Sequence, residues 1–270
     1  MKGRLGLFIG LPLFLGMALA GLTAVFWTPY DPRAARIRER LRGPSADHWF
    51  GTDEFGRDVL SRLMDGAQIS FTVALCTVAF AIVVGSAIGV LTGFLRGTVD
   101  RVIMTFNDAL LAFPGILLAL GVMVALGPGQ SSIILALGLA YTPSVVRILR
   151  GTVLSLREKE YVEASRMIGN SDAYTMVRHI LPNCVAPIAV LATSMFGWAI
   201  LSESALSFLG LGVPPPAATW GNMLAAGRPY MATAEWLSLA PGCCIAVTLL
   251  GVNLLGDALR DWLDPRMSRA

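Results

Sequence analysis

The sequence is dominated by long apolar runs, six of which are about as long as a helix that crosses a membrane. A helix rises about 1.5 Å per residue, so about 20 residues span a hydrocarbon core of about 30 Å. Within that core the backbone must satisfy its own hydrogen bonds, which favours helices. We therefore predict an all-α membrane protein with six transmembrane helices. The runs are Leu5–Trp27, Ile69–Leu95, Val102–Leu126, Ser131–Leu149, Cys184–Leu209 and Trp236–Leu255.

Composition supports this prediction, because 55% of the residues are hydrophobic and only 14% are charged. Soluble domains carry about 25% charged residues. The net charge of +3 is small and no long basic tract is present, which argues against nucleic acid as a partner. The cysteines lie in apolar runs and lack the spacing of a zinc site or a disulfide framework, so we interpret them as packed apolar residues. They are Cys76, Cys184, Cys243 and Cys244.

The first run has some features of a signal peptide. Lys2 and Arg4 precede it, and residues 18–20 resemble a cleavage site. However, the apolar run continues to Trp27 without a polar region after that site. We therefore predict that it is retained as the first membrane span.

The distribution of basic residues predicts the orientation. With the N-terminus in the cytoplasm, the cytoplasmic segments hold 13 Lys and Arg residues and the external segments hold eight. Seven of those eight lie in the external loop 28–68, where seven acidic residues balance them. Cytoplasmic loops carry the excess of Lys and Arg, so both termini are expected in the cytoplasm.

The spans divide the chain into three parts. Residues 1–68 form the first helix and an external loop, 69–260 form a core of five transmembrane helices, and 261–270 form a cytoplasmic tail. Within the core, the cytoplasmic segment of about 150–183 is long enough to hold structure of its own.

This cytoplasmic segment has the pattern of two short helices. Ser155 and Glu158 have the spacing of a capping box, and Gly169 can end the first helix. Ser171 suits the start of the second helix, which Pro182 is expected to end. Periodicity alone does not decide whether this hairpin docks on a partner or lies on lipid headgroups. One face of the first helix would carry Tyr161, Ala164, Ser165 and Ile168.

The segment resembles the EAA loop of ABC importer permeases. That family has the pattern E-A-A, three residues, G, nine residues and I-x-L-P, and here residues 163–182 keep the spacing. Ser165 replaces the second alanine and His179 replaces the isoleucine. In the family this loop forms the coupling helix that sits in a cleft of the cytoplasmic ATPase. The resemblance implies an ATPase-coupling interface at Tyr161, Glu163, Ala164, Ser165, Ile168, Gly169 and Ser171.

Further stretches resemble the C-type permeases of dipeptide, oligopeptide and nickel importers. They are residues 51–62, 203–212, 220–224 and 253–266, so the resemblance covers nearly the whole chain. It implies a type I ABC importer permease fold in the bacterial inner membrane. It also implies a second, homologous permease, two ATPase subunits that bind ATP and Mg, and an external substrate-binding protein. Peptides are the expected cargo, with nickel or another small solute as the alternative.

The chain itself is not expected to be an enzyme or to hold a cofactor. A P-loop needs a Gly-Lys-Ser/Thr step, and neither Lys2 nor Lys159 lies in one. The two histidines, His48 and His179, are too far apart for a metalloprotease helix. A secondary transporter would show inverted repeats, which are not evident, and a membrane scaffold would bind no ATPase.

Two carboxylates lie inside apolar runs, Asp108 in the third and Glu203 in the fifth. A charge at membrane depth costs a few kcal/mol, so it normally faces protein or water. Either residue could line a translocation path or could be paired with a neighbouring helix in a structural role, which we favour slightly. Pro114, Gly138 and Pro143 are consistent either with helix kinks or with plain helix packing.

Overall fold

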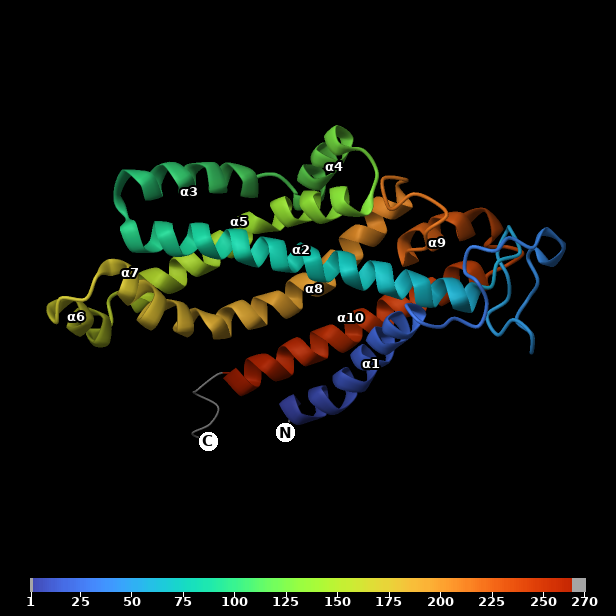
Figure 1. Ribbon diagram of the computed structural model, residues 1–270, viewed down its shortest axis with the longest axis horizontal. Coiled ribbons are helices and arrows are strands. Elements are labelled where there is room, and N and C mark those ends of the chain that lie inside the picture. Colours follow the sequence, from blue (N-terminus) through green and yellow to red (C-terminus); the bar gives the residue numbers. More distant parts are fainter. Residues whose placement is uncertain (1, 264–270) are drawn as a thin grey trace.

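The computed structural model describes residues 2–263, most of which are helical (Figure 1). The side chains of residues 2–5 and all of residues 264–270 lie outside the described part, including most of the expected tail 261–270 and the end of the resemblance at 264–266. The longer helices are α1 (Lys2–Ala24), α2 (Val59–Leu95), α3 (Gly97–Leu111), α4 (Gly115–Leu126), α5 (Gln130–Leu156), α8 (Val185–Phe208) and α10 (Trp236–Leu263). The shorter ones are α6 (Glu160–Met167), α7 (Asp172–Thr175) and α9 (Trp220–Gly227).

Within residues 2–263, five helical stretches are each long and apolar enough to cross a membrane, and the pair α3 and α4 makes a sixth if it counts as one span. The expected span Val102–Leu126 is not one continuous helix, because α3 and α4 meet at an angle of 92° next to Pro114, where a kink was one of the two interpretations. Pro114 stands immediately before α4. A proline disfavours helical geometry in the residue before it and has no N–H to continue the helix, so the chain turns here.

Other helix ends also differ from expectation. Helix α2 begins at Val59 rather than Ile69, because the Asp58 carboxylate caps it by accepting from the backbone N–H of Ser61 at 2.8 Å. Helix α5 runs through Pro143 to Leu156, well beyond Leu149. Apolar length therefore locates the spans in the sequence, while capping and packing set where the helices end.

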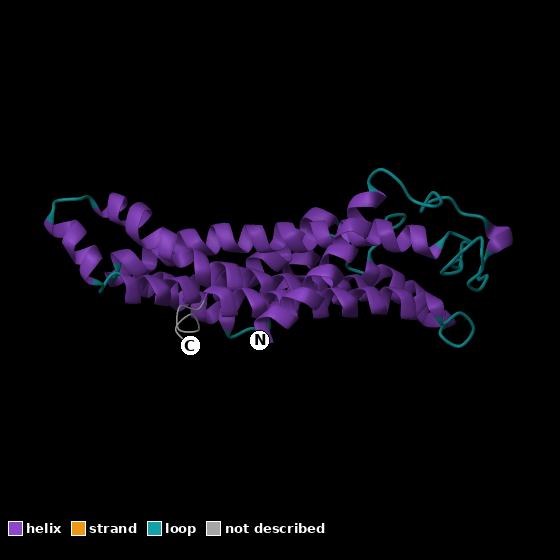
Figure 2. Cartoon of the chain, turned by 90° about the horizontal axis from the view of Figure 1, so that it is seen from below, coloured by secondary structure: helices purple, strands orange, loops and turns teal. Residues whose placement is uncertain are grey.

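The helices form an elongated bundle with two distinct ends (Figures 1 and 2). One end, which we call the loop end, carries loop 25–58 and α9. The other, the hairpin end, carries α6 and α7. The start of α1 and the end of α10 both point towards the hairpin end (Figure 1).

The most extensive contact joins α2 and α5. Three glycines spaced four residues apart, Gly85, Gly89 and Gly93, form one stripe on α2. A Cβ atom at Gly85 would come within 2.6 Å of the Cβ of Val145, and one at Gly93 within 2.9 Å of the Cβ of Val153. Only small residues allow two helices to approach this closely, which is a common way of packing helices in membranes.

Aromatic rings join four helices near the loop end. The ring of Phe71 on α2 lies 5.5 Å from that of Phe196 on α8 and 5.9 Å from that of Trp220 on α9. Phe14 of α1 lies 5.5 Å from Phe71 and 5.6 Å from Phe196. Edge-on and tilted contacts of this kind are favourable for aromatic rings. The cluster fixes α9 against the membrane helices.

Candidate functional site

The segment 157–184, which we call the coupling segment, projects from the hairpin end of the bundle (Figure 1). Its first helix is α6, and Lys159, rather than Ser155, is the residue before that helix. The expected capping box of Ser155 and Glu158 is wrong, because α5 continues through Leu156 and includes Ser155. Packing of α5 against α2 extends the helix past a local start signal.

Two other expected signals are confirmed. Gly169 has φ of +91°, the left-handed conformation that ends a helix and that glycine adopts readily. Ser171 caps α7, and its Oγ accepts from the backbone N–H of Tyr174 at 3.2 Å. The loop between α6 and α7 is therefore set by the local sequence.

Pro182 does not end the second arm, contrary to expectation. After α7 the chain makes a π-turn over Met176–Ile180 and a 3₁₀ turn over Leu181–Cys184, and then enters α8. Pro182 lies in the first turn of the 3₁₀ piece, where its missing N–H is tolerated. Residues Asp172–Phe208 thus form one helical path from the coupling segment into the membrane bundle.

The inner face of α6 is held against α7 by hydroxyl groups. Ser165 is buried, and its Oγ lies 3.0 Å from the Oγ1 of Thr175 and accepts from the Asn170 side chain at 3.1 Å. Val162 is also buried. Of the four residues expected on one face, only Ser165 points inward, so its role is to hold the two arms together.

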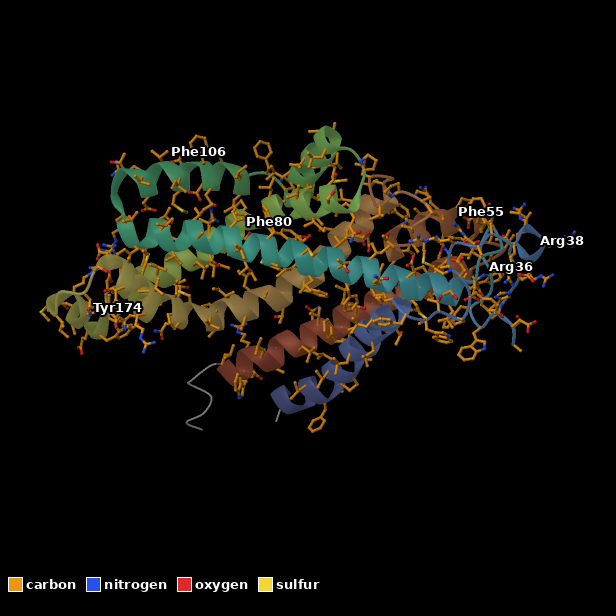
Figure 3. The ribbon with its side chains drawn as sticks, viewed as in Figure 1. Arg36, Arg38, Phe55, Phe80, Phe106 and Tyr174 are labelled. Carbon is orange, nitrogen blue, oxygen red and sulfur yellow. The ribbon has the colours of Figure 1, made fainter. Side chains whose placement is uncertain are left out.

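The outer face of the coupling segment is exposed and partly apolar. Ile168 is 80% exposed, and Tyr161, Glu163 and Gly169 are exposed beside it, whereas Ala164 is half-buried. Three further apolar residues of this surface were not predicted, although apolar side chains in a polar segment are a usable signal. They are Met167, Tyr174 and Val177, the second of which is labelled at the tip of the hairpin end in Figure 3.

Arginines attach the coupling segment to the end of α2. Arg157 Nη1 donates to the backbone oxygen of Phe94 at 2.7 Å and to that of Gly93 at 3.4 Å. The Arg166 guanidinium lies over the Phe94 ring at 5.0 Å. Cations stabilise the free carbonyl groups at a helix C-terminus. Burial, followed by the neighbouring Arg96 and Arg166 guanidiniums, lowers the pKa of Arg157. A movement of α6 would therefore be transmitted to the end of α2.

Inside the bundle, Asp108 and Glu203 have different surroundings. Asp108 of α3 accepts from Arg147 Nη2 of α5 at 2.7 Å, and both side chains are 57% exposed. Glu203 of α8 is completely buried and accepts from the hydroxyls of Ser207 at 2.7 Å and Ser70 at 3.2 Å. Glu203 thus joins α8 to α2, while Asp108 joins α3 to α5 at a surface.

A third carboxylate, Asp100, was missed because it lies two residues before the apolar run that begins at Val102. Arg150 of α5 donates to both of its oxygens, from Nε at 2.6 Å and from Nη2 at 2.7 Å. This two-point geometry is the strongest form of an arginine–carboxylate pair. It fixes the start of α3 to α5, and Asp108 and Arg147 add a second, more exposed contact between the same helices.

Comparison with known proteins gives consistent results. Residues 85–269 match the family described as "Binding-protein-dependent transport system inner membrane component". A Brucella suis biovar 1 protein, provisionally named a peptide transport system permease, is 47% identical over 96% of this chain and 87% of its own length. A dipeptide transport system permease of Alkalihalophilus pseudofirmus is 40% identical, with coverage of 98% and 87%. A glutathione transport system permease of Pectobacterium atrosepticum is 39% identical, with coverage of 96% and 86%.

Solved structures share the fold, and one of them illustrates the match. It is that of the MetNI methionine ABC transporter in inward facing conformations, with a TM-score of 0.62 and 17% sequence identity. The match covers 75% of this chain and 96% of that one. The type I permease fold expected from the sequence is thereby confirmed.

Proposed function

This chain belongs to the family of binding-protein-dependent transport system inner membrane components, and from that premise we propose that it imports short peptides, driven by an ATPase that docks on the coupling segment. Relatives named for the transport of peptides, dipeptides and glutathione support the choice of cargo. The main support for this docking site is that the two faces of α6 differ. Its inner face is bonded to α7, while Glu163 and Ile168 on its outer face are exposed.

The orientation that we propose places the hairpin end in the cytoplasm and the loop end outside. The ATPase is then on the side of the coupling segment, and the start of α1 and the end of α10 point towards the same side. The excess of basic residues in the segments at this end supports the same orientation. A substrate-binding protein would approach loop 25–58 and α9 from the other side.

The other components of the transporter are proposed to be separate chains. They are a homologous second permease subunit that forms a heterodimer with this one, two ATPase subunits that bind ATP and Mg, and a periplasmic or lipid-anchored binding protein. Closure of the ATPases on ATP would draw the coupling segments together. Through the Arg157–Phe94 contact and the continuous path into α8, that movement would switch the bundle from inward- to outward-facing.

For the two carboxylates inside the bundle we propose different roles. Glu203, buried among serine hydroxyls, is structural and joins α8 to α2. Asp108, exposed beside Arg147, lines the path of the cargo. The difference follows from exposure, since a buried carboxylate without access to water cannot reach a passing solute.

The docking site can be tested by purifying the subunit in mild detergent as wild type and as Glu163→Lys. We expect the ATPase to co-purify with the wild type and to be lost from the variant, together with peptide uptake. Glu235→Lys makes the same charge change at an exposed position of the loop end and serves as the control. If Glu163→Lys keeps both the ATPase and normal uptake, the assignment of α6 as the docking helix is wrong.

A further inference from the structure

An open cleft of about 670 Å³ lies along α3, in the half of the bundle nearest the hairpin end. Its lining is unusual for a membrane protein, because it contains charged groups of both signs. Asp100, Arg101 and Asp108 come from α3, Arg150 comes from α5, and Arg96 lies at the junction of α2 and α3. The cleft is therefore chemically suited to a ligand that carries both charges.

The position of these groups excludes a lipid-facing surface. Asp108 lies 11 residues into α3, about 16 Å along the helix from its first residue. The 92° bend follows at residues 112–114, which are exposed. Within a membrane span, exposed charges and non-helical backbone are tolerated only beside protein or water, so this side of α3 is not expected to face lipid. By contrast, Phe106 is 70% exposed and points away from the bundle on another side of α3 (Figure 3).

The two ion pairs between α3 and α5 differ in how easily they can open. Asp100 and Arg150 share two short hydrogen bonds, and their side chains are only 10% and 28% exposed. Asp108 and Arg147 share one hydrogen bond, and both are largely exposed. An exposed pair contributes little net stability, so its carboxylate can exchange partners at small cost. The first pair fixes the wall of the cleft, and the second offers an exchangeable carboxylate.

A guanidinium lies on the same helix at a useful spacing. Arg101 lines the cleft, is exposed, and among residues 2–263 makes no ion pair within 4.0 Å. It precedes Asp108 by seven residues, so the two lie on one face about 10 Å apart along the helix. An extended peptide advances about 3.3–3.6 Å per residue, so two or three residues cover most of this separation.

We infer that this cleft binds the zwitterionic backbone of a short peptide during its passage, with Asp108 receiving the α-amino group and Arg101 the α-carboxylate. The amino group displaces Arg147 from Asp108, and no covalent step is involved. This inference rests on the proposed function and adds to it a selective contact within the permease itself. It predicts that cargo with both termini free is preferred over cargo with one terminus blocked, beyond the selectivity of the binding protein.

The test uses the complete complex in proteoliposomes with trialanine and trialanine amide, which lacks the carboxylate. We expect Arg101→Gln to lower trialanine uptake per ATP hydrolysed about five-fold and amide uptake less than two-fold, as for loss of one charge-assisted contact. Arg101→Lys should restore most of the trialanine uptake. Arg260→Gln, an exposed arginine on α10 outside the cleft, is the matched control.

A charge exchange tests Asp108 without removing its ion pair. The double variant Asp108→Arg with Arg147→Asp keeps a pair between α3 and α5 but moves the carboxylate to α5. A purely structural pair would tolerate the exchange, whereas a site for the amino group would lose trialanine uptake. Thermal unfolding of the purified complex shows whether the exchanged pair supports the fold, and a variant that unfolds early is replaced by Asp108→Asn.

The outcomes separate this inference from the function on which it rests. Equal effects of Arg101→Gln on both peptides, or no effect on either, overturn the binding site while leaving the permease function intact. If the wild-type complex moves neither peptide, and peptide-loaded binding protein does not stimulate ATP hydrolysis, both are overturned.

Discussion

Loop 25–58 and the coupling segment lie at opposite ends of one bundle, and both are rich in charged residues, yet their charges have different partners. In the loop, the buried Asp53 carboxylate lies 2.6 Å from Arg57 Nε and 3.3 Å from Arg62 Nε. In the coupling segment, Glu163 is exposed. The loop thus contains a buried cluster of charges that are paired with one another, with other charged residues such as Arg38 exposed around it, while Glu163 on the outer face of the coupling segment is available to another chain.

Bonds over long sequence distances hold the loop in place. His48 Nδ1 lies 2.8 Å from Asp58 Oδ1, and the Tyr30 ring lies 4.7 Å from the His48 ring. Trp236 Nε1 at the start of α10 donates to the backbone oxygen of Thr52 at 3.3 Å. Burial raises the pKa of Glu54 in the same loop. These contacts give the loop a fixed structure, which a surface that receives a binding protein would require.

This contrast gives a criterion for distinguishing a rigid loop from a docking helix when both are polar. Buried charge is stable only if it is paired and hydrogen-bonded inside the protein, so it indicates a self-sufficient region. Exposed apolar residues mixed with charge indicate a surface that another protein covers, and both regions carry them, such as Ile168 in the coupling segment and Trp49 in the loop, so buried charge is what distinguishes the two. Three substitutions test the contrast.

The largest effect on stability is expected from Asp53→Ala in the loop. It would leave Arg57 and Arg62 buried without their shared carboxylate, which should lower the free energy of unfolding by about 4 kcal/mol. Thermal unfolding in detergent measures the change, and Asp47→Ala, an exposed carboxylate of the same loop, is the control. A loss no larger than that of the control would contradict the view that the loop is held by buried charge.

Arg157→Ala in the coupling segment should change coupling more than stability. Loss of its bonds to the end of α2 should cost about 1 kcal/mol of unfolding free energy. Because the docking face is untouched, ATPase binding should persist while uptake per ATP falls about ten-fold, equivalent to about 1.4 kcal/mol. Arg157→Lys should recover part of the uptake. Parallel loss of ATPase binding would show that Arg157 supports docking rather than transmission.

The smallest effect is expected from Gly169→Ala. A Cβ atom there would meet no atom within 4 Å, so its cost is the left-handed backbone alone, about 1 kcal/mol. We expect ATPase affinity to fall about five-fold, by the conversion of 1.4 kcal/mol per ten-fold change. Gly169→Asn should be milder, because asparagine tolerates this conformation better than alanine. Titration of the solubilised permease with ATPase gives both affinities, and equal losses would argue against a backbone cause.

Much of this architecture was predictable because membrane spans are specified by apolar length and helix ends by single residues such as Gly169 and Ser171. The sequence indicated at most a kink near Pro114 and not its angle, because hydropathy gives the length of an apolar run but not the direction of the helix axis. The capping signal at Ser155 failed because tertiary packing on α2 overrides a local preference. Asp100 was missed because its importance depends on Arg150, 50 residues away along the chain.

The same limit applies to the coupling segment. Its outer surface could be predicted only in part, because the EAA resemblance supplies Glu163 and Gly169, which are exposed, but also Ser165, which is buried. Its attachment could not, because the contact between Arg157 and the end of α2 depends on two helices ending at the same level. Side-chain spacing in the sequence shows which residues share a face of one helix, but it does not show which residues of two different helices are in contact.

The π-turn at Met176–Ile180 has a geometric consequence for the whole chain. A π-turn accommodates one more residue than a regular turn, and each residue of a helix corresponds to a rotation of about 100°. The turn therefore sets the rotation of the coupling segment about the helix axis relative to α8, which packs among the other long helices. Inserting or deleting a single residue at this point would rotate the coupling segment by about 100° relative to α8, without changing the helical geometry of α8 itself.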